Sequence, residues 1–154
     1  MNIRSVIQSQ YLASLAMLKQ AITKCPPEVW DASQDKDKSW FKAYHVLYYA
    51  HLYLKTEGQE FVRWKKQRER ESISPLSKEE VLMRLALIER EVASHIPLMD
   101  LDAKSGYYWL PSNKLELQFY NIRHIQQHTG ELYERLSRTD VKLGWVAQRQ
   151  KEPE

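Results

Sequence analysis

Two histidines four residues apart, His124 and His128, are the pair in this sequence best suited to chemistry. On a helix, residues at this spacing stack about one turn apart on the same face and can bind a single ion. A third histidine, His45, lies within an aromatic and apolar stretch. Three neutral imidazoles with a fourth position left open are the ligand set of catalytic zinc, and they also suit nickel or ferrous iron. The sequence therefore predicts a divalent metal site on these three histidines.

Glu131 is the candidate catalytic residue beside this site. It follows His124 by seven residues, which places it about 20° from that histidine around a helix. From there it could orient a metal ligand or move protons. Tyr48 and Tyr49 lie about one turn after His45 and could line the same cleft. A metal ion at this site would lower the pKa of a bound water to about 7.

The other histidines and the single cysteine are expected to lie outside the metal site. His51 follows His45 by six residues, about 120° around a helix, so both cannot readily point at one ion. His95 ends a predicted helix, where we expect it to interact with the final carbonyl groups and the helix dipole. Cys25 has no base nearby in the sequence, which favours a quiet thiol over a nucleophile.

Apolar residues at three- and four-residue intervals predict four long helices. We place these helices at about Ile3–Cys25, Trp40–Lys55, Ser77–Ile96 and Asn113–Arg138. Around the histidine pair, the apolar spacing places His124 and His128 on the stripe that should face the core. The sequence thus predicts an all-α fold and a four-helix bundle.

Local signals set the expected ends of these helices. Cys25 is followed by two prolines, which stop the first helix because proline lacks an amide donor. Ser39 is the predicted N-cap of the second helix. Ser77 followed by Glu80 is a capping-box signature, and Asn113 followed by Glu116 resembles another capping pair. Ser39, Ser77 and Asn113 are therefore the predicted starts of the second, third and fourth helices.

The connector between the second and third predicted helices, Gly58–Leu76, is about twenty residues long and could span roughly 60 Å when extended. This length allows the two helices to run parallel, which predicts an up-down-down-up topology. The charged run Arg63–Glu71 within the connector is interpreted as a solvated surface segment, with a nucleic-acid patch as the alternative. The aromatic stretch 106–111 is interpreted as loop packing, with a substrate wall as the alternative.

Composition and charge are typical of one helical domain. The chain has 154 residues, 43% of them hydrophobic and 28% charged, with only 4 glycines. We expect a single domain over 1–154, with a core at about 3–138 and a short tail at 139–154. The net charge of +3 argues neither for nor against nucleic acid, and because the sequence forms no continuous basic face we expect no nucleic-acid partner. One cysteine excludes an internal disulfide, and no stretch approaches the ~20 apolar residues of a membrane helix. We expect a cytoplasmic protein.

Two stretches, Trp40–Tyr49 and Ile122–Leu132, resemble the DinB-like (damage-inducible, YfiT-type) family of metalloenzymes. The resemblance covers about Ser9–Trp145 but is specific only at these two stretches. It implies an up-down-down-up four-helix bundle. It also implies a divalent metal held by one histidine of the second helix and a pair of the last helix, and the chain fills all three positions.

The resemblance implies several activities and selects none of them. Relatives include thiol-dependent transferases and an isomerase that use low-molecular-weight thiols, and others are hydrolases. We expect a bacterial metal-dependent enzyme acting on a small molecule, with zinc or nickel as the ion and iron or manganese as further candidates. The alternative is a non-catalytic metal-binding or stress-response bundle protein, which could be a homodimer. A cleft that reaches the ion favours the enzyme, and a fourth protein ligand favours the structural role.

Overall fold

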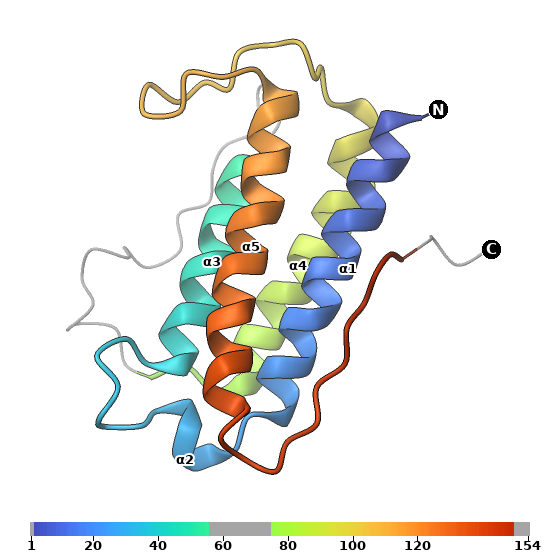
Figure 1. Ribbon diagram of the computed structural model, residues 1–154. Helices are drawn as coiled ribbons and strands as arrows, with labels where there is room; N and C mark the ends of the chain where they lie inside the picture. The colour runs from blue at the N-terminus through green and yellow to red at the C-terminus, as the bar shows by residue number, and fades with distance from the viewer. Residues whose placement is uncertain (1, 56–74, 150–154) are drawn as a thin grey trace.

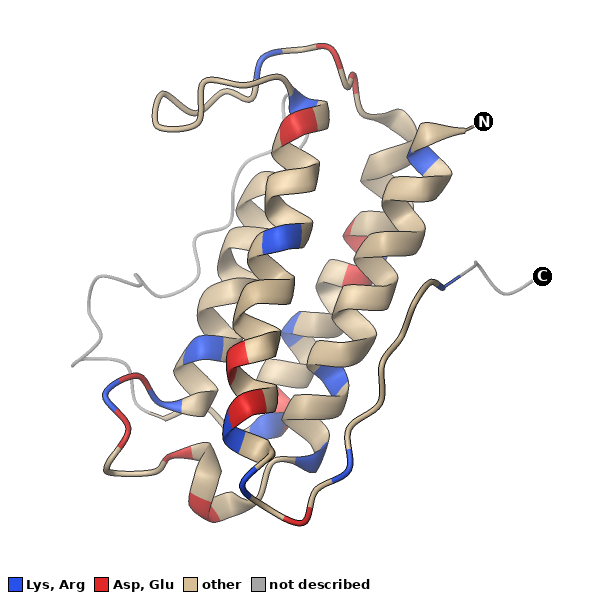
Figure 2. Ribbon diagram, viewed as in Figure 1, with Lys and Arg blue, Asp and Glu red and all other residues tan. Residues whose placement is uncertain are grey.

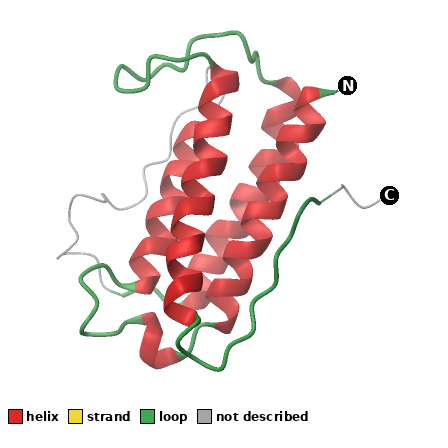
Figure 3. Ribbon diagram, in the orientation of Figure 1, coloured by secondary structure: helices red, strands yellow, loops and turns green. Residues whose placement is uncertain are grey.

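The apolar spacing of the sequence produces helices in the computed structural model, which describes residues 2–55 and 75–149. No described residue belongs to a strand (Figure 3), and one isolated bridge joins Lys104 to Asn113. The helices are α1 (Ile3–Lys24), α2 (Pro27–Trp30), α3 (Ser39–Tyr53), α4 (Lys78–His95), the 3-10 helix η1 (Ile96–Leu98) and α5 (Lys114–Leu136). The predicted all-α class is confirmed for this part of the chain.

The four long helices pack side by side (Figure 1). α1 packs mainly against α4 and α5, and α3 packs against the same two helices. Fully buried side chains from all four meet in one apolar core, among them Leu15, Leu47, Leu85 and Ile125. Burying one such aliphatic side chain stabilises a fold by about 1.5–3 kcal/mol. This core holds α3 and α5 against each other, and these are the two helices that carry the predicted metal ligands.

Two of the three predicted helix starts are confirmed. The Ser77 hydroxyl accepts a hydrogen bond from the Glu80 amide (3.2 Å), and the Glu80 carboxylate accepts one from the Ser77 amide (2.8 Å). This reciprocal pair is the predicted capping box of α4. At the start of α5, the Asn113 side chain accepts a hydrogen bond from the Glu116 amide (2.9 Å).

The prediction for Ser39 was wrong. Lys38 is the N-cap of α3 and makes no capping hydrogen bond with its side chain, and Ser39 is the first helical residue. The buried hydroxyl of Ser39 accepts a hydrogen bond from Arg135 of α5 (3.2 Å). Arg135, from another helix, therefore bonds the hydroxyl that was predicted to cap the start of α3.

The short helix α2 was not predicted, although its signal is present. Pro27 opens the helix, and proline suits the first helical position because the amide missing there has no partner within the helix. Trp30 ends α2, and its indole donates a hydrogen bond to the carbonyl of Leu76, just before α4 (2.8 Å). The helix thus fixes the entry to α4.

Most of the predicted connector Gly58–Leu76, including the charged run Arg63–Glu71, lies outside the described residues. The described part of the C-terminal tail returns beside α1 (Figure 1). There Gln20 donates a hydrogen bond to the carbonyl of Gly144 and accepts one from its amide, and Lys24 donates to the carbonyl of Lys142.

Basic and acidic residues occur together at the lower end of the helices as drawn in Figure 2. This mixture agrees with a net charge of only +3. Within the part of the chain that the structure describes, no helix combines the length and the apolar character needed to cross a membrane.

Candidate metal centre

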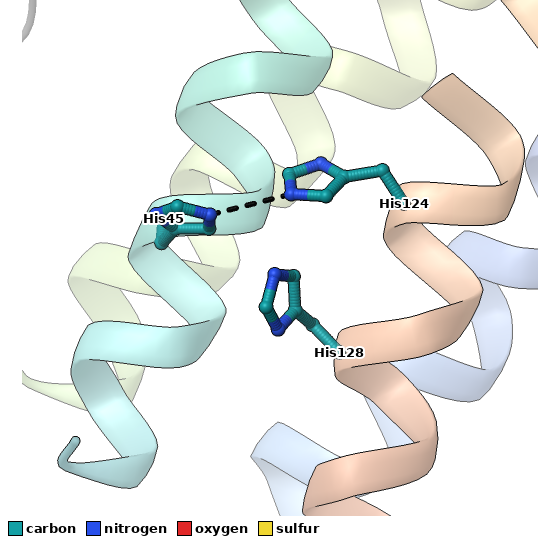
Figure 4. Close-up of side chains that lie close together, drawn as sticks. All are labelled: His45, His124 and His128. Carbon is teal, nitrogen blue, oxygen red and sulfur yellow. Dashed lines mark hydrogen bonds between the residues drawn. The ribbon is translucent and has the colours of Figure 1, made fainter. Parts of the chain in front are cut away.

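The three predicted ligands come together where α3 packs against α5. His45 lies on α3, His124 and His128 lie on α5, and their rings face one another (Figure 4). The Nε2 atoms of His45 and His124 are 3.3 Å apart, and one ring nitrogen from each histidine lies within 4.8 Å of the others. Residues about eighty positions apart in the chain therefore form one cluster.

The spacing of one pair of these nitrogens suits a transition-metal ion. At zinc–nitrogen distances of about 2.0–2.1 Å, two ligands of a tetrahedral ion lie about 3.3–3.4 Å from each other. The Nε2 atoms of His45 and His124 already have this separation of 3.3 Å. The donor set is nitrogen only, which also suits nickel and iron.

The histidines lie beside the buried stripe of α5, and not on it as the sequence predicted. Asn121, Ile125 and Thr129 occupy the centre of the stripe and are fully buried, whereas His124 and His128 are half-buried. The polar members of the stripe bond to backbone, with the Asn121 amide donating to the carbonyl of Ala50 and the Thr129 hydroxyl donating to that of Ile125. His124 and His128 are therefore placed at the edge of this stripe, toward α3.

The environment of His124 keeps its imidazole neutral. Burial and the neighbouring His128 lower the pKa of His124 to about 4, against a smaller opposite effect of Glu131. A neutral imidazole is the form that binds a metal. Its Nδ1 atom is buried and makes no hydrogen bond with any described residue.

The ring of His128, by contrast, is held by a hydrogen bond to a carboxylate. Its Nδ1 atom lies 3.0 Å from Oε2 of Glu131, and the same oxygen lies 2.6 Å from the ammonium of Lys42. Burial by itself raises the pKa of Glu131, but the hydrogen bonds from Lys42 and His128 and their charges outweigh it and lower the pKa to about 2. In Figure 4 the second nitrogen of His128 faces the other two rings.

Sequence reasoning missed Lys42. The available signal was that it is the one Lys, Arg, Asp or Glu in α3, three residues before His45. Glu131, the candidate catalytic residue, lies beside a predicted ligand and is held there by two donors. A carboxylate with so low a pKa is a weak base, and this geometry suits orientation of His128 better than proton transfer.

Aromatic rings surround the cluster. The Tyr49 ring lies 5.1 Å from that of His45 and 5.7 Å from that of His124, between ring centroids. The Tyr120 ring is parallel to that of His124 within 7° at 6.2 Å. Of the two tyrosines predicted to line the site, Tyr49 contacts the histidine rings, and Tyr48 packs against Tyr49 at 5.4 Å.

The remaining candidates have other partners. His51 lies against Glu91 of α4, with 2.7 Å between its Nδ1 atom and a carboxylate oxygen. The ring of His95 bonds to the carbonyl of Leu54, at the end of α3 (3.0 Å). The sequence did not predict this bond to the end of a neighbouring helix, and the expected interaction of His95 with the dipole of its own helix stays a prediction. Cys25 is buried, and burial raises the pKa of its thiol to about 11.

Three cavities of the described structure are lined by residues other than the three histidines. They measure about 630, 510 and 340 Å³, and none of these three is lined by the predicted ligands. The smallest comes nearest along the chain, because Tyr120 and Arg123 of α5 line it. Among the described residues, no fourth His, Cys, Asp or Glu joins the three-histidine set.

No family model matches this chain, and neither a curated protein nor a solved structure matches it. Membership of the DinB-like family therefore stays a prediction from the two sequence stretches.

Proposed function

We propose that this protein is a metal-dependent enzyme that acts on a small molecule through a divalent ion bound by His45, His124 and His128. The observation that carries the proposal is the convergence of one nitrogen from each ring within 4.8 Å. Zinc and nickel suit this ligand set best, and iron or manganese are further candidates. Three protein ligands leave a coordination position free for a reactant, which is typical of catalytic sites.

That free position allows two reaction classes. When bound, the ion would supply Lewis acidity that favours the deprotonated form of a water or a low-molecular-weight thiol. The first nucleophile gives a hydrolase and the second a thiol S-transferase. In this proposal Glu131 orients His128, while Tyr49 and Tyr120 shape the approach to the cluster.

The proposal includes a DinB-like, up-down-down-up bundle. In support of this topology, the colours of Figure 1 show that the chain runs downward in the view along α1 and α5 and upward along α3 and α4. The histidine positions on α3 and α5 also agree with the ligand pattern that the resemblance implies.

Metal content tests the first half of the proposal. Protein purified without an affinity tag should contain about one ion per chain by elemental analysis, and calorimetric titration should rank zinc, nickel, iron and manganese. His45→Ala should lose this ion, whereas the control His51→Ala should retain it because His51 pairs with Glu91. A wild-type protein that binds none of the four ions would overturn the proposal. Turnover of activated esters, and of electrophiles with a panel of small thiols, then distinguishes the two reaction classes.

A non-catalytic metal-binding bundle is the second candidate, because the three-histidine set by itself does not distinguish a catalytic ion from a structural one. It predicts tight metal binding without turnover in either assay. It also predicts that small ligands such as azide or thiols leave the visible spectrum of the cobalt-substituted protein unchanged. An enzyme with a free coordination position should show a shift.

A further inference from the structure

A short ion pair beside the histidines is made by Lys42, which is not one of the predicted metal ligands. The ammonium of Lys42 lies 2.6 Å from Oε2 of Glu131, and only 15% of the Lys42 side chain is exposed. That same oxygen is 3.0 Å from Nδ1 of His128. One carboxylate oxygen thus joins a lysine of α3 to a histidine of α5.

On each of the two helices, the ion-pair residue and the histidine are three residues apart. Lys42 precedes His45 by three residues on α3, and His128 precedes Glu131 by three residues on α5. Side chains three apart are neighbours on a helix face. Two contacts between α3 and α5, the ring contact of the histidines and the ion pair, therefore lie about one turn apart at the same interface. The ion pair fixes how the two helices meet there.

We propose that Lys42 is a positioning residue of the metal centre. It holds Glu131 in the conformation that accepts the Nδ1 proton of His128, and it thereby keeps the lone pair of His128 Nε2 directed at His45 and His124. The metal-binding consequence rests on the proposed function, whereas the orientation of the imidazole does not.

The physical need for such a residue comes from the two tautomers of neutral imidazole. Only the nitrogen without a proton can bind an ion, and a hydrogen bond at the other nitrogen selects which one that is. Glu131 is 36% exposed, so its flexible side chain would populate other rotamers if the carboxylate had no second partner. The better-buried ammonium of Lys42 supplies that partner.

The sign of the effect separates positioning from simple charge. A lysine close to a divalent cation repels it, so its charge alone predicts that removing Lys42 tightens metal binding. Positioning predicts the reverse, because losing a group that orients a ligand typically weakens metal affinity 10- to 100-fold. Since Lys42 acts through Glu131, we expect a loss near the lower limit, about tenfold.

The test compares Lys42→Met with Lys42→Arg, which keeps a positive donor, and with Lys38→Met. Lys38 is a matched control four residues earlier, because its ammonium donates to the carbonyl of Ala32 and not to the site (2.6 Å). Nitrogen NMR of the metal-free proteins reports the His128 tautomer, and titration with zinc gives the Kd. We expect the Nδ1-protonated form in the wild type and both controls, and increased Nε2 protonation with weaker zinc binding in Lys42→Met.

A double-mutant cycle with Glu131→Ala checks the route of the effect. If Lys42 acts through Glu131, Lys42→Met in that background should not change the tautomer further and should not weaken zinc binding further. An unchanged tautomer in folded Lys42→Met, or tighter zinc binding, overturns the proposal. Lys42→Gln serves the same comparison if the methionine variant does not fold. If the wild type binds no metal but Lys42→Met still shifts the tautomer, the proposed function fails and the positioning role stands.

Discussion

The Nε2 atoms of His45 and His124 lie 3.3 Å apart across the interface of α3 and α5. Two imidazole nitrogens attract each other at this distance only if one of them carries a proton. An ion bound between them would take the place of that proton, which in a neutral ring can move to Nδ1, so metal binding at this site should change a tautomer without releasing a net proton. The two helices are already close enough for the exchange to need little backbone movement.

Metal should stabilise the fold by mass action. An ion that binds only the folded state, at a hundred times its Kd, adds about 2.7 kcal/mol to the free energy of unfolding. We expect chelation to lower the melting temperature of the wild type and to leave that of His128→Ala unchanged. His51→Ala is the control, and its melting temperature should still respond to the chelator. A wild-type protein shown to contain metal but indifferent to its removal would contradict a tightly coupled site.

Glu131→Gln distinguishes an orienting carboxylate from a base. The amide keeps an oxygen that can accept the proton of His128 Nδ1, but it cannot take up a proton itself. Because two donors hold Glu131 and its pKa is about 2, we expect the variant to lose less than about tenfold in turnover. Loss of a general acid–base group would instead lower turnover ~10²–10⁴-fold. Steady-state kinetics with the substrate found in the screens measures the difference, and circular dichroism checks the fold.

The Cys25 thiol should be unreactive in the folded protein. Burial raises its pKa from 9.0 to about 11, which lowers the thiolate fraction at neutral pH by about a hundredfold. Alkylation followed by mass spectrometry should therefore be slow at pH 7 and should accelerate about tenfold per pH unit toward pH 10. Denaturant should remove the protection, and Cys25→Ser should remove the labelled product. Rapid labelling of the native protein at pH 7 would show that the thiol is accessible and activated.

The buried hydrogen bond between Tyr11 and Gln118 should stabilise the core. The Tyr11 hydroxyl lies 2.6 Å from the Gln118 side-chain oxygen, and both residues are fully buried. Tyr11→Phe leaves that oxygen without its donor, which should lower the free energy of unfolding by about 1–3 kcal/mol. Tyr133→Phe is the matched control. Tyr133 bonds the Gly144 carbonyl near the surface (3.1 Å), so its loss should be roughly 0.5 kcal/mol in urea denaturation.

The sequence by itself determined what depends on neighbours within about one helical turn. The Ser77–Glu80 capping box joins residues three positions apart, so its chemistry could be read directly from the chain. The same reach explains why His124 and His128 could be recognised as a pair. Apolar spacing gave the four long helices, because burial of one face is what stabilises a helix in a folded protein.

Only the tertiary structure decided which distant side chains meet. Lys42 and Glu131 are 89 residues apart, and the position of Lys42 on α3 does not by itself tell which residue of α5 it meets. Ser39 bonds Arg135, 96 residues away, in place of capping its own helix. Both outcomes depend on the rotation of α3 against α5, which the packing of the shared core sets. A side chain at a helix interface bonds whatever the facing helix presents, and its partner is therefore fixed by that packing and not by sequence spacing.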